Sequence, residues 1–89
     1  MPIFNWDEEK NIWLQKNRNV SFEHLLSAIE DKKILKILPH PNNKYKHQIL
    51  VIFEYDSYAW VAPCEYKDEI MLIKTIFPSR KATRIYFNK

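Results

Sequence analysis

The stretch that decides the fold is Gln48–Tyr66, which reads QILVIFEYDSYAWVAPCEY. It contains two runs rich in β-branched and aromatic residues, Gln48–Tyr55 and Ala59–Tyr66, on either side of the polar pair Asp56-Ser57. Such runs favour strands, and a short polar connection between them is typical of a tight hairpin. The centre of the chain is therefore predicted to form an antiparallel hairpin.

Similar runs flank this hairpin. Ile34–Leu38 precedes it across the loop Pro39–Lys46, whose prolines and asparagines predict an open, mobile connection. Ile70–Phe77 follows it across a second tight turn at Lys67-Asp68. The result is an antiparallel β-meander of about four strands. Because Pro63 has no N–H to donate, its strand needs a bulge or an unpaired edge there.

The residues before the meander predict two helices. Asp7 is a good N-cap for the first helix, which follows a short apolar lead that could be a strand and ends at Asn17–Asn19. Ser21 caps the second helix, in which His24 is expected on the surface. This helix carries an apolar stripe made of Phe22, Leu25, Leu26 and Ile29.

After Pro78, Ser79 can cap a short terminal helix that runs through Tyr86. The expected fold is α+β, with the two N-terminal helices packed on one face of the meander and the other face partly open. Residues 1–89 are expected to form a single domain with one core. Of the aromatic residues, Phe53, Trp60 and Phe77 are expected in that core.

Composition narrows the class of protein. With 46% hydrophobic residues, the chain has enough apolar surface to fold without a structural metal ion or a disulfide bond. The single cysteine, Cys64, closes no disulfide and fits a reducing, cytoplasmic setting as a buried small hydrophobe. No run is long and apolar enough to span a bilayer. The chain has no glycine, which excludes P-loops and dinucleotide fingerprints, and its His and Cys spacing matches no zinc site.

Charge is unevenly distributed along the chain. Residues 1–31 contain three basic and six acidic side chains, whereas residues 32–89 contain eleven basic and five acidic ones. The final third is a basic zone without carboxylates after Glu69. This asymmetry favours contact with a polyanion, although solvated surface lysines produce the same distribution.

Three motifs, read together, resemble one family. They are Trp6-Asp7-x-x-Lys10-Asn11, Val20-Ser21-Phe22-Glu23 and Ser79-Arg80-Lys81-Ala82-Thr83-Arg84. Their order and spacing resemble the BrnT family of small toxins in the RelE-like ribonuclease group, and the likeness runs from Phe4 to Tyr86. It implies a RelE/BrnT-like fold and a cytoplasmic, metal-independent endoribonuclease that needs no cofactor, cleaves RNA and inhibits translation as the toxin of a type II toxin-antitoxin system.

The resemblance also implies partners. A ribbon-helix-helix antitoxin would form a hetero-oligomer with the chain, cover aromatic residues such as Tyr58 and Trp60, and carry the complex to operator DNA. The family usually has Lys-His-Gly where this chain has Asn17-Arg18-Asn19. That departure supports an alternative, a non-catalytic interaction module or decayed toxin that binds an antitoxin and takes part in operon repression. A simple nucleic-acid-binding domain is a third possibility.

Metal-free RNA cleavage needs a base, an acid and cations that stabilise the charged phosphorane. Arg80 and Arg84, one turn apart, are the expected phosphate ligands, unless they are solvated or pair with Glu8, Glu9 or Glu65. Lys74, His47 and Tyr86 complete the predicted catalytic set. Each of these three residues also has a non-catalytic interpretation. In it, Lys74 extends past the sheet edge into solvent, His47 is merely exposed, and the Tyr86 ring is packed.

Lys10, Arg18 and Lys81 are the predicted RNA-binding residues, and pairing with Asp7 would explain Lys10 equally well. No metal ligands are predicted. The whole hypothesis expects Lys74, Arg80 and Arg84 to converge on one pocket that holds a phosphodiester.

Overall fold

The central hairpin forms as predicted. In the computed structural model, which describes residues 3–87, strands β3 (Gln48–Tyr55) and β4 (Tyr58–Lys67) pair antiparallel in one unbroken register. Asp56 and Ser57 both adopt positive φ, 55° and 58°, and connect the strands in two residues. Two consecutive left-handed residues match the twist of the strands that they join.

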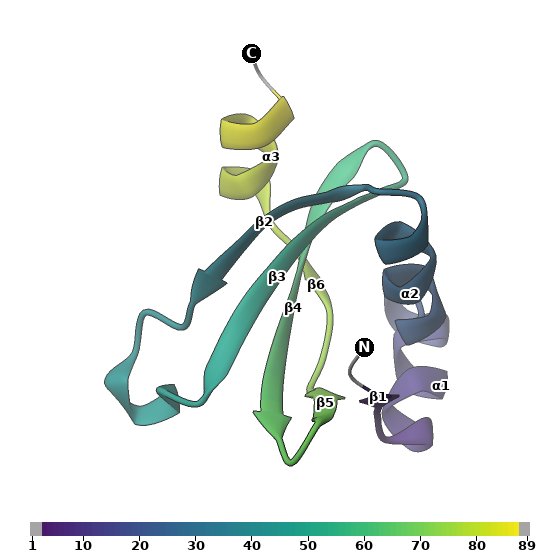
Figure 1. Cartoon of the computed structure of the whole chain (residues 1–89). Coiled ribbons are helices and arrows are strands. Elements are labelled where there is room, and N and C mark those ends of the chain that lie inside the picture. The colour runs from purple at the N-terminus through teal and green to yellow at the C-terminus, as the bar shows by residue number, and fades with distance from the viewer. Residues whose placement is uncertain (1–2, 88–89) are drawn as a thin grey trace.

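The elements around this hairpin complete an α+β fold, which confirms the predicted class (Figure 1). They are β1 (Ile3–Asn5), α1 (Glu8–Arg18), α2 (Phe22–Glu30), β2 (Ile34–Pro39), the 3₁₀ turn η1 (Asn43–Tyr45), β5 (Ile70–Ile73), β6 (Phe77–Pro78) and α3 (Arg80–Phe87). The sheet order is β1-β5-β4-β3-β2, with β6 also paired to β4.

The sheet is larger than the predicted meander and is mixed rather than antiparallel. Within the described residues it has six strands, because the apolar lead forms β1 and pairs parallel to β5 through Ile3 and Ile70. The predicted strand Ile70–Phe77 is broken into β5 and β6. The carbonyl of Pro63 accepts a hydrogen bond from the Lys74 N–H (2.9 Å), but Pro63 has no N–H to return, so the ladder is interrupted opposite it.

Two predicted connections differ in detail. The second hairpin turn is Asp68-Glu69, with φ of 51° and 67°, one residue later than expected because β4 continues through Lys67. The loop after β2 contains the 3₁₀ turn η1 and local hydrogen bonds, and its mobility stays a prediction. The Asn42 side chain accepts from the Lys44 N–H (2.9 Å), and the ring of His40 lies 4.8 Å from that of Tyr45.

Capping residues set the helix bounds as predicted. The Asp7 carboxylate accepts from the N–H of Glu9 (2.9 Å) at the start of α1, and Asn19 ends that helix in the left-handed region. The Ser79 hydroxyl accepts from the N–H of Ala82 (3.0 Å) at the start of α3. No helix within residues 3–87 has both the length and the apolar composition needed to cross a bilayer.

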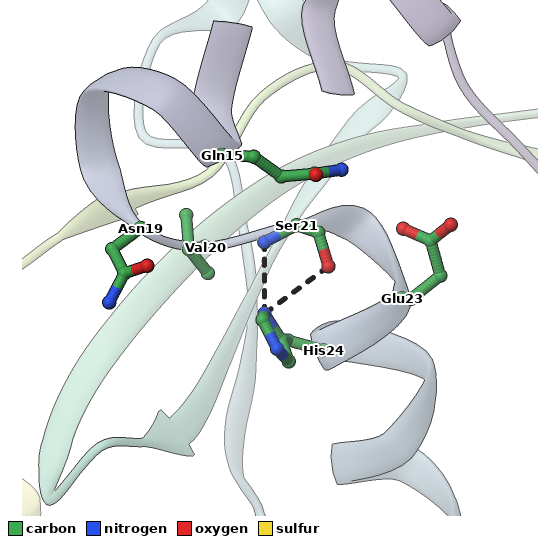
Figure 2. Close-up of a pocket in the computed structure, with 6 residues that line it drawn as sticks. All are labelled: Gln15, Asn19, Val20, Ser21, Glu23 and His24. Atoms are coloured by element: carbon green, nitrogen blue, oxygen red, sulfur yellow. Dashed lines mark hydrogen bonds between the residues drawn. The ribbon is translucent and has the colours of Figure 1, made fainter. Parts of the chain in front are cut away.

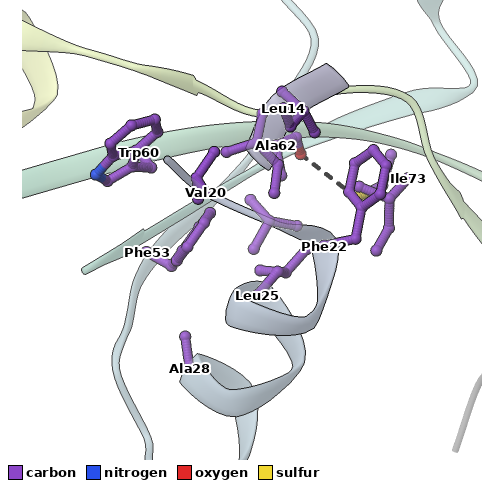
Figure 3. Packing of buried hydrophobic residues seen from close by; sticks show 12 residues of the cluster. Leu14, Val20, Phe22, Leu25, Ala28, Phe53, Trp60, Ala62 and Ile73 are labelled. Atoms are coloured by element: carbon purple, nitrogen blue, oxygen red, sulfur yellow. Dashed lines mark hydrogen bonds between the residues drawn. The ribbon is translucent and has the colours of Figure 1, made fainter. Parts of the chain in front are cut away.

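Two apolar clusters lie on the two faces of the sheet. On the face covered by α1 and α2, Leu14, Phe22 and Leu25 pack against Phe53 and other buried strand residues (Figure 3). On the opposite face, α3 covers part of the sheet, with Ala82 packed among Ile52, Ala59 and Val61. Burial of each large apolar side chain contributes about 1.5–3 kcal/mol. The open face is thus partly closed by the C-terminal helix.

The aromatic residues divide between core and rim. Phe53 and Trp60 are buried as predicted, with Trp60 only 8% exposed, whereas Phe77 is half-buried at the edge of the second cluster. The expectation that a partner covers an exposed Trp60 is therefore wrong, because the indole already packs inside the domain. Tyr58 is half-buried against the same core.

Candidate functional site

The first motif is used mainly to join α1 to α2. Asn11 is fully buried, and its Oδ1 accepts from the Phe22 N–H (2.8 Å) while its Nδ2 donates to Glu23 Oε1 (2.8 Å). Trp6 packs its ring 5.6 Å from that of Phe22. With Asp7 capping the helix, Lys10 is the one specified residue of this motif without such a role.

Glu23 of the second motif belongs to the same junction. Its pKa lies below the ordinary value, chiefly because the Asn11 side chain donates a hydrogen bond to the charged carboxylate. A backbone hydrogen bond adds to this effect, and partial burial opposes it. Glu23 is therefore a fixed negative charge beside the start of α2.

His24 forms one wall of a polar hollow of about 500 Å³ at this junction (Figure 2). Its Nδ1 accepts from the Ser21 N–H (2.9 Å), so the neutral ring carries its proton on Nε2. The ring also stacks on Tyr55, with centroids 4.2 Å apart. The ring is therefore half-buried rather than freely exposed on the helix surface, as was expected. The signal was the spacing Ser-x-x-His, in which histidine replaces the Glu or Gln of a capping box.

The third motif fixes α3 on the sheet through its small residues. Thr83 Oγ1 donates to the carbonyl of Ser79 (2.7 Å) and accepts from the Ala59 N–H (2.9 Å), while Ala82 is buried. These contacts leave Arg80 and Arg84 exposed on the side of the helix turned away from the sheet.

Neither arginine of α3 has an acidic partner among residues 3–87. Their i, i+4 spacing places them on the same side of the helix, as predicted. Within residues 3–87 the only ion pair is between Lys74 and Glu65, so the pairing of these arginines with Glu8, Glu9 or Glu65 is not found. Arg80 and Arg84 are thus available to an external anion.

Two predicted RNA-binding residues lie on α1 around an exposed tryptophan. The Lys10 amine is 4.6 Å and the Arg18 guanidinium 4.9 Å from the centroid of a Trp13 ring. Arg18 Nη1 also donates to the carbonyl of Ile76 (2.6 Å). Trp13 keeps 42% of its surface exposed. Cation–π contacts of this kind hold both cations in place along the helix surface.

Lys74 lies in the connection between β5 and β6, not in a strand as expected. It lines a hollow of about 300 Å³ together with Lys10 and Asp7. Its amine is 3.7 Å from the Glu65 carboxylate, and both side chains are more than a third exposed. A pair this open contributes little to stability, and it leaves the lysine accessible.

The predicted catalytic residues do not share a cavity. Lys74 lines the hollow beside α1 and reaches Glu65, whereas Arg80 and Arg84 project from α3, and neither arginine lines that hollow. Tyr86 is half-buried in an apolar groove that Lys81 also lines. His47 is exposed in the loop before β3, at the end of the hairpin away from α3. The expected single pocket for Lys74, Arg80 and Arg84 is absent from the hollows described.

Cys64 is fully buried in the core as expected, and its thiol donates weakly to the carbonyl of Ala62. Burial raises the pKa of this thiol to about 12. Among residues 3–87, no group of three or more His, Cys, Asp or Glu side chains is arranged to hold a metal ion.

Comparison with known proteins returns no match. No family model matches the chain, and neither a curated protein nor a solved structure matches it.

Proposed function

We propose that this chain is the toxin of a type II toxin-antitoxin system, a RelE/BrnT-like endoribonuclease that cleaves RNA without a metal ion. One observation carries the proposal. When every motif residue with a capping, packing or buried hydrogen-bonding role is set aside, four residues remain, and all four are cations: Lys10, Arg80, Lys81 and Arg84.

The fold does not require positive charge at Arg80, Lys81 or Arg84. Each of the three is exposed on the surface of α3, where any good helix former would serve, whereas the Lys10 amine also contacts the Trp13 ring. Arg80 and Arg84 lack carboxylate partners within the described residues, and unpaired surface charges add little to the free energy of unfolding. Clustered cations that the fold does not use are suited to a polyanion such as RNA.

The cations form two groups, which we name by position. The α1 group is Lys10, Arg18 and Lys74, and the α3 group is Arg80, Lys81 and Arg84. Six residue steps, at most about 20 Å of extended chain, separate Lys74 from Arg80. We propose that a single-stranded RNA runs along the segment from Lys74 to Arg80 and contacts both groups.

In this arrangement the paired guanidinium groups of Arg80 and Arg84 bind the phosphate and stabilise the charge that develops during cleavage. Lys74, at the other end of the path, lines the same hollow as Lys10 of α1. The catalytic roles of His47 and Tyr86 stay predictions, because neither lies beside these arginines. The cytoplasm and a ribbon-helix-helix antitoxin, bound as a hetero-oligomer that reaches operator DNA, belong to the same proposal.

The test is cleavage of RNA by the purified chain in excess chelator, together with growth after the chain is induced alone. The account expects growth arrest and cleavage. The double change Arg80→Ala and Arg84→Ala should strongly reduce both at equal protein abundance. Lys32→Ala with Lys33→Ala removes the same charge outside the motifs and should not. Normal growth with intact RNA for the parent chain would contradict the proposal.

A second candidate function rests on the divided site. Because Lys74 and the two arginines do not line a common hollow, the chain also fits a non-catalytic module that binds RNA or an antitoxin. That candidate predicts stable complexes with salt-dependent affinity and intact RNA in the same assay.

A further inference from the structure

The open edge of the sheet at β2 combines three features that the proposed function does not use. They are an unpaired strand edge, an apolar groove on each side of it, and a set of exposed lysines along the segment that contains the strand. The strand lies at the end of the sheet order and pairs only with β3 (Figure 1). Its outer side is free of other strands within residues 3–87.

Unused main-chain groups point outward along this edge. The N–H of His40 donates to the carbonyl of Gln48 (3.2 Å), which makes these two a hydrogen-bonded pair. Hydrogen-bonded and outward-facing residues alternate along an antiparallel strand. The N–H and carbonyl of Ile37 and the carbonyl of Pro39 therefore face the open edge.

An apolar groove lies on each face beside this edge. On the α2 side, a hollow of about 310 Å³ is lined only by apolar residues, among them Ile34, Ile37 and Ile49. On the α3 side, a groove of about 290 Å³ is lined mainly by apolar residues, among them Leu38 and Ile85, together with Ser79 and Lys81. Ile37 is 57% exposed and Ile85 53%. A strand added beside β2 would send alternate side chains toward the two grooves.

The lysines around β2 indicate what kind of segment would bind there. Between Asp31 and Glu54 the chain has five lysines and no carboxylate: Lys32, Lys33, Lys36, Lys44 and Lys46. All five are exposed. Two copies of this chain joined through β2 would bring these lysines together and repel each other. An acidic segment would be attracted instead.

β2 also has features that oppose unselective pairing with the strand edges of other molecules. Lys36 is exposed on it, Pro39 ends it, and its register shifts between Ile34 and Lys36. Such features restrict edge-to-edge association between like molecules. These features do not exclude a partner whose charge is complementary to that of the lysines.

We propose that β2 is a docking site for an extended acidic segment of another protein, which adds a strand to the sheet and places alternate apolar side chains in the two grooves. This inference does not depend on ribonuclease activity. It fits an eight-residue segment in which apolar and acidic residues alternate.

The probe is a set of synthetic eight-residue peptides in which Ile, Val or Leu alternates with Glu, titrated against the purified full chain by fluorescence anisotropy. A matched set with Lys in place of Glu should bind at least about tenfold more weakly. Peptides of the same composition, rearranged to an i, i+3, i+4 helical spacing, should lose affinity similarly. Failure of all alternating acidic peptides to bind at about 1 mM would overturn the proposal.

Backbone methylation tests strand addition itself. Two isomers of the best peptide, N-methylated at the odd or at the even positions, differ only in which N–H groups they remove. One isomer should lose binding and the other should keep it, because only alternate N–H groups face β2. Equal binding by both isomers would refute main-chain pairing.

Ile37→Lys and Ile85→Lys test the two grooves separately, and the exposure of both side chains keeps the fold intact. Each change should weaken binding about fivefold or more, whereas Ile12→Lys on α1, where the side chain is 47% exposed, should not. An effect of only one groove change would indicate a helix docked on one face. Self-association through β2 in sedimentation would indicate a second copy, and either result would overturn the proposal.

Discussion

The α1–α2 junction and the C-terminal helix use polar residues in opposite ways. At the junction, Asn11 of α1 hydrogen-bonds two groups of α2, the Phe22 N–H and the Glu23 carboxylate. On α3, Ser79 and Thr83 anchor the helix, but Arg80 and Arg84 bind nothing within the described residues. A polar motif residue therefore indicates a function only after its structural partners have been counted.

Among the predictions that test this difference between the junction and α3, the largest effect is expected on α3. Arg80→Ala with Arg84→Ala should lower the rate of RNA cleavage about 10²–10³-fold, because charge stabilisation in the transition state is lost. The free energy of unfolding should change by less than about 0.5 kcal/mol, since neither side chain is buried or paired. Cleavage kinetics and urea unfolding of the same preparation measure both. A large loss of stability would make these arginines structural.

The junction should respond in the opposite sense. Asn11→Ala leaves the Phe22 N–H unsatisfied and opens a small cavity, which should lower the free energy of unfolding by about 2–4 kcal/mol. Urea denaturation measures the change. Asn17→Ala is the matched control, because Asn17 is exposed and its Nδ2 only donates to the carbonyl of Trp13 (2.9 Å). Equal effects of the two changes would refute the central role of Asn11.

The burial of Cys64 in the core should affect the free energy of unfolding at alkaline pH. The folded Cys64 thiol has a pKa of about 12, against 9.0 as its ordinary value, so the folded state binds this proton more tightly. Its contribution is complete below pH 9 and is lost as the pH rises toward 12, by at most about 1.4 kcal/mol per pH unit. Comparison with Cys64→Ala between pH 8.5 and 10.5 isolates it. Parallel pH profiles of the two proteins would contradict the buried thiol.

The smallest effect is expected at Glu23. Its pKa is lowered in the folded state, so the carboxylate stabilises the fold above its ordinary value of 4.5, and this contribution disappears as the pH falls below that value. Glu23→Gln should flatten the acid side of the stability profile, because glutamine keeps an acceptor for Asn11 but does not titrate. Urea midpoints between pH 6 and 3 test this, and an unchanged acid slope would exclude the mechanism.

Local signals predicted much of the fold. Asp7, Ser21 and Ser79 set helix starts through bonds to residues within one turn, and the Asp56-Ser57 turn set the central hairpin. The parallel pairing of β1 with β5 was not predictable in this way, because it joins residues 67 positions apart through backbone groups that carry no sequence signal.

The candidate site was predicted residue by residue but not in its arrangement. The sequence identified the cations, yet the separation of Lys74 from Arg80 depends on where α3 packs on the sheet. It also depends on the break that Pro63 imposes on the neighbouring strand. Both are long-range packing effects that local periodicity does not encode.

The salt dependence of RNA affinity tests the central claim most directly, because each phosphate contact adds about 0.7 to the slope of log affinity against log salt for single-stranded RNA. If Arg80 and Arg84 each bind a phosphate, their joint replacement by alanine should reduce that slope by about 1.4. The Lys32→Ala and Lys33→Ala chain should keep the parent slope. Equal slopes for all three proteins, or equal losses in both variants, would contradict a phosphate site on α3.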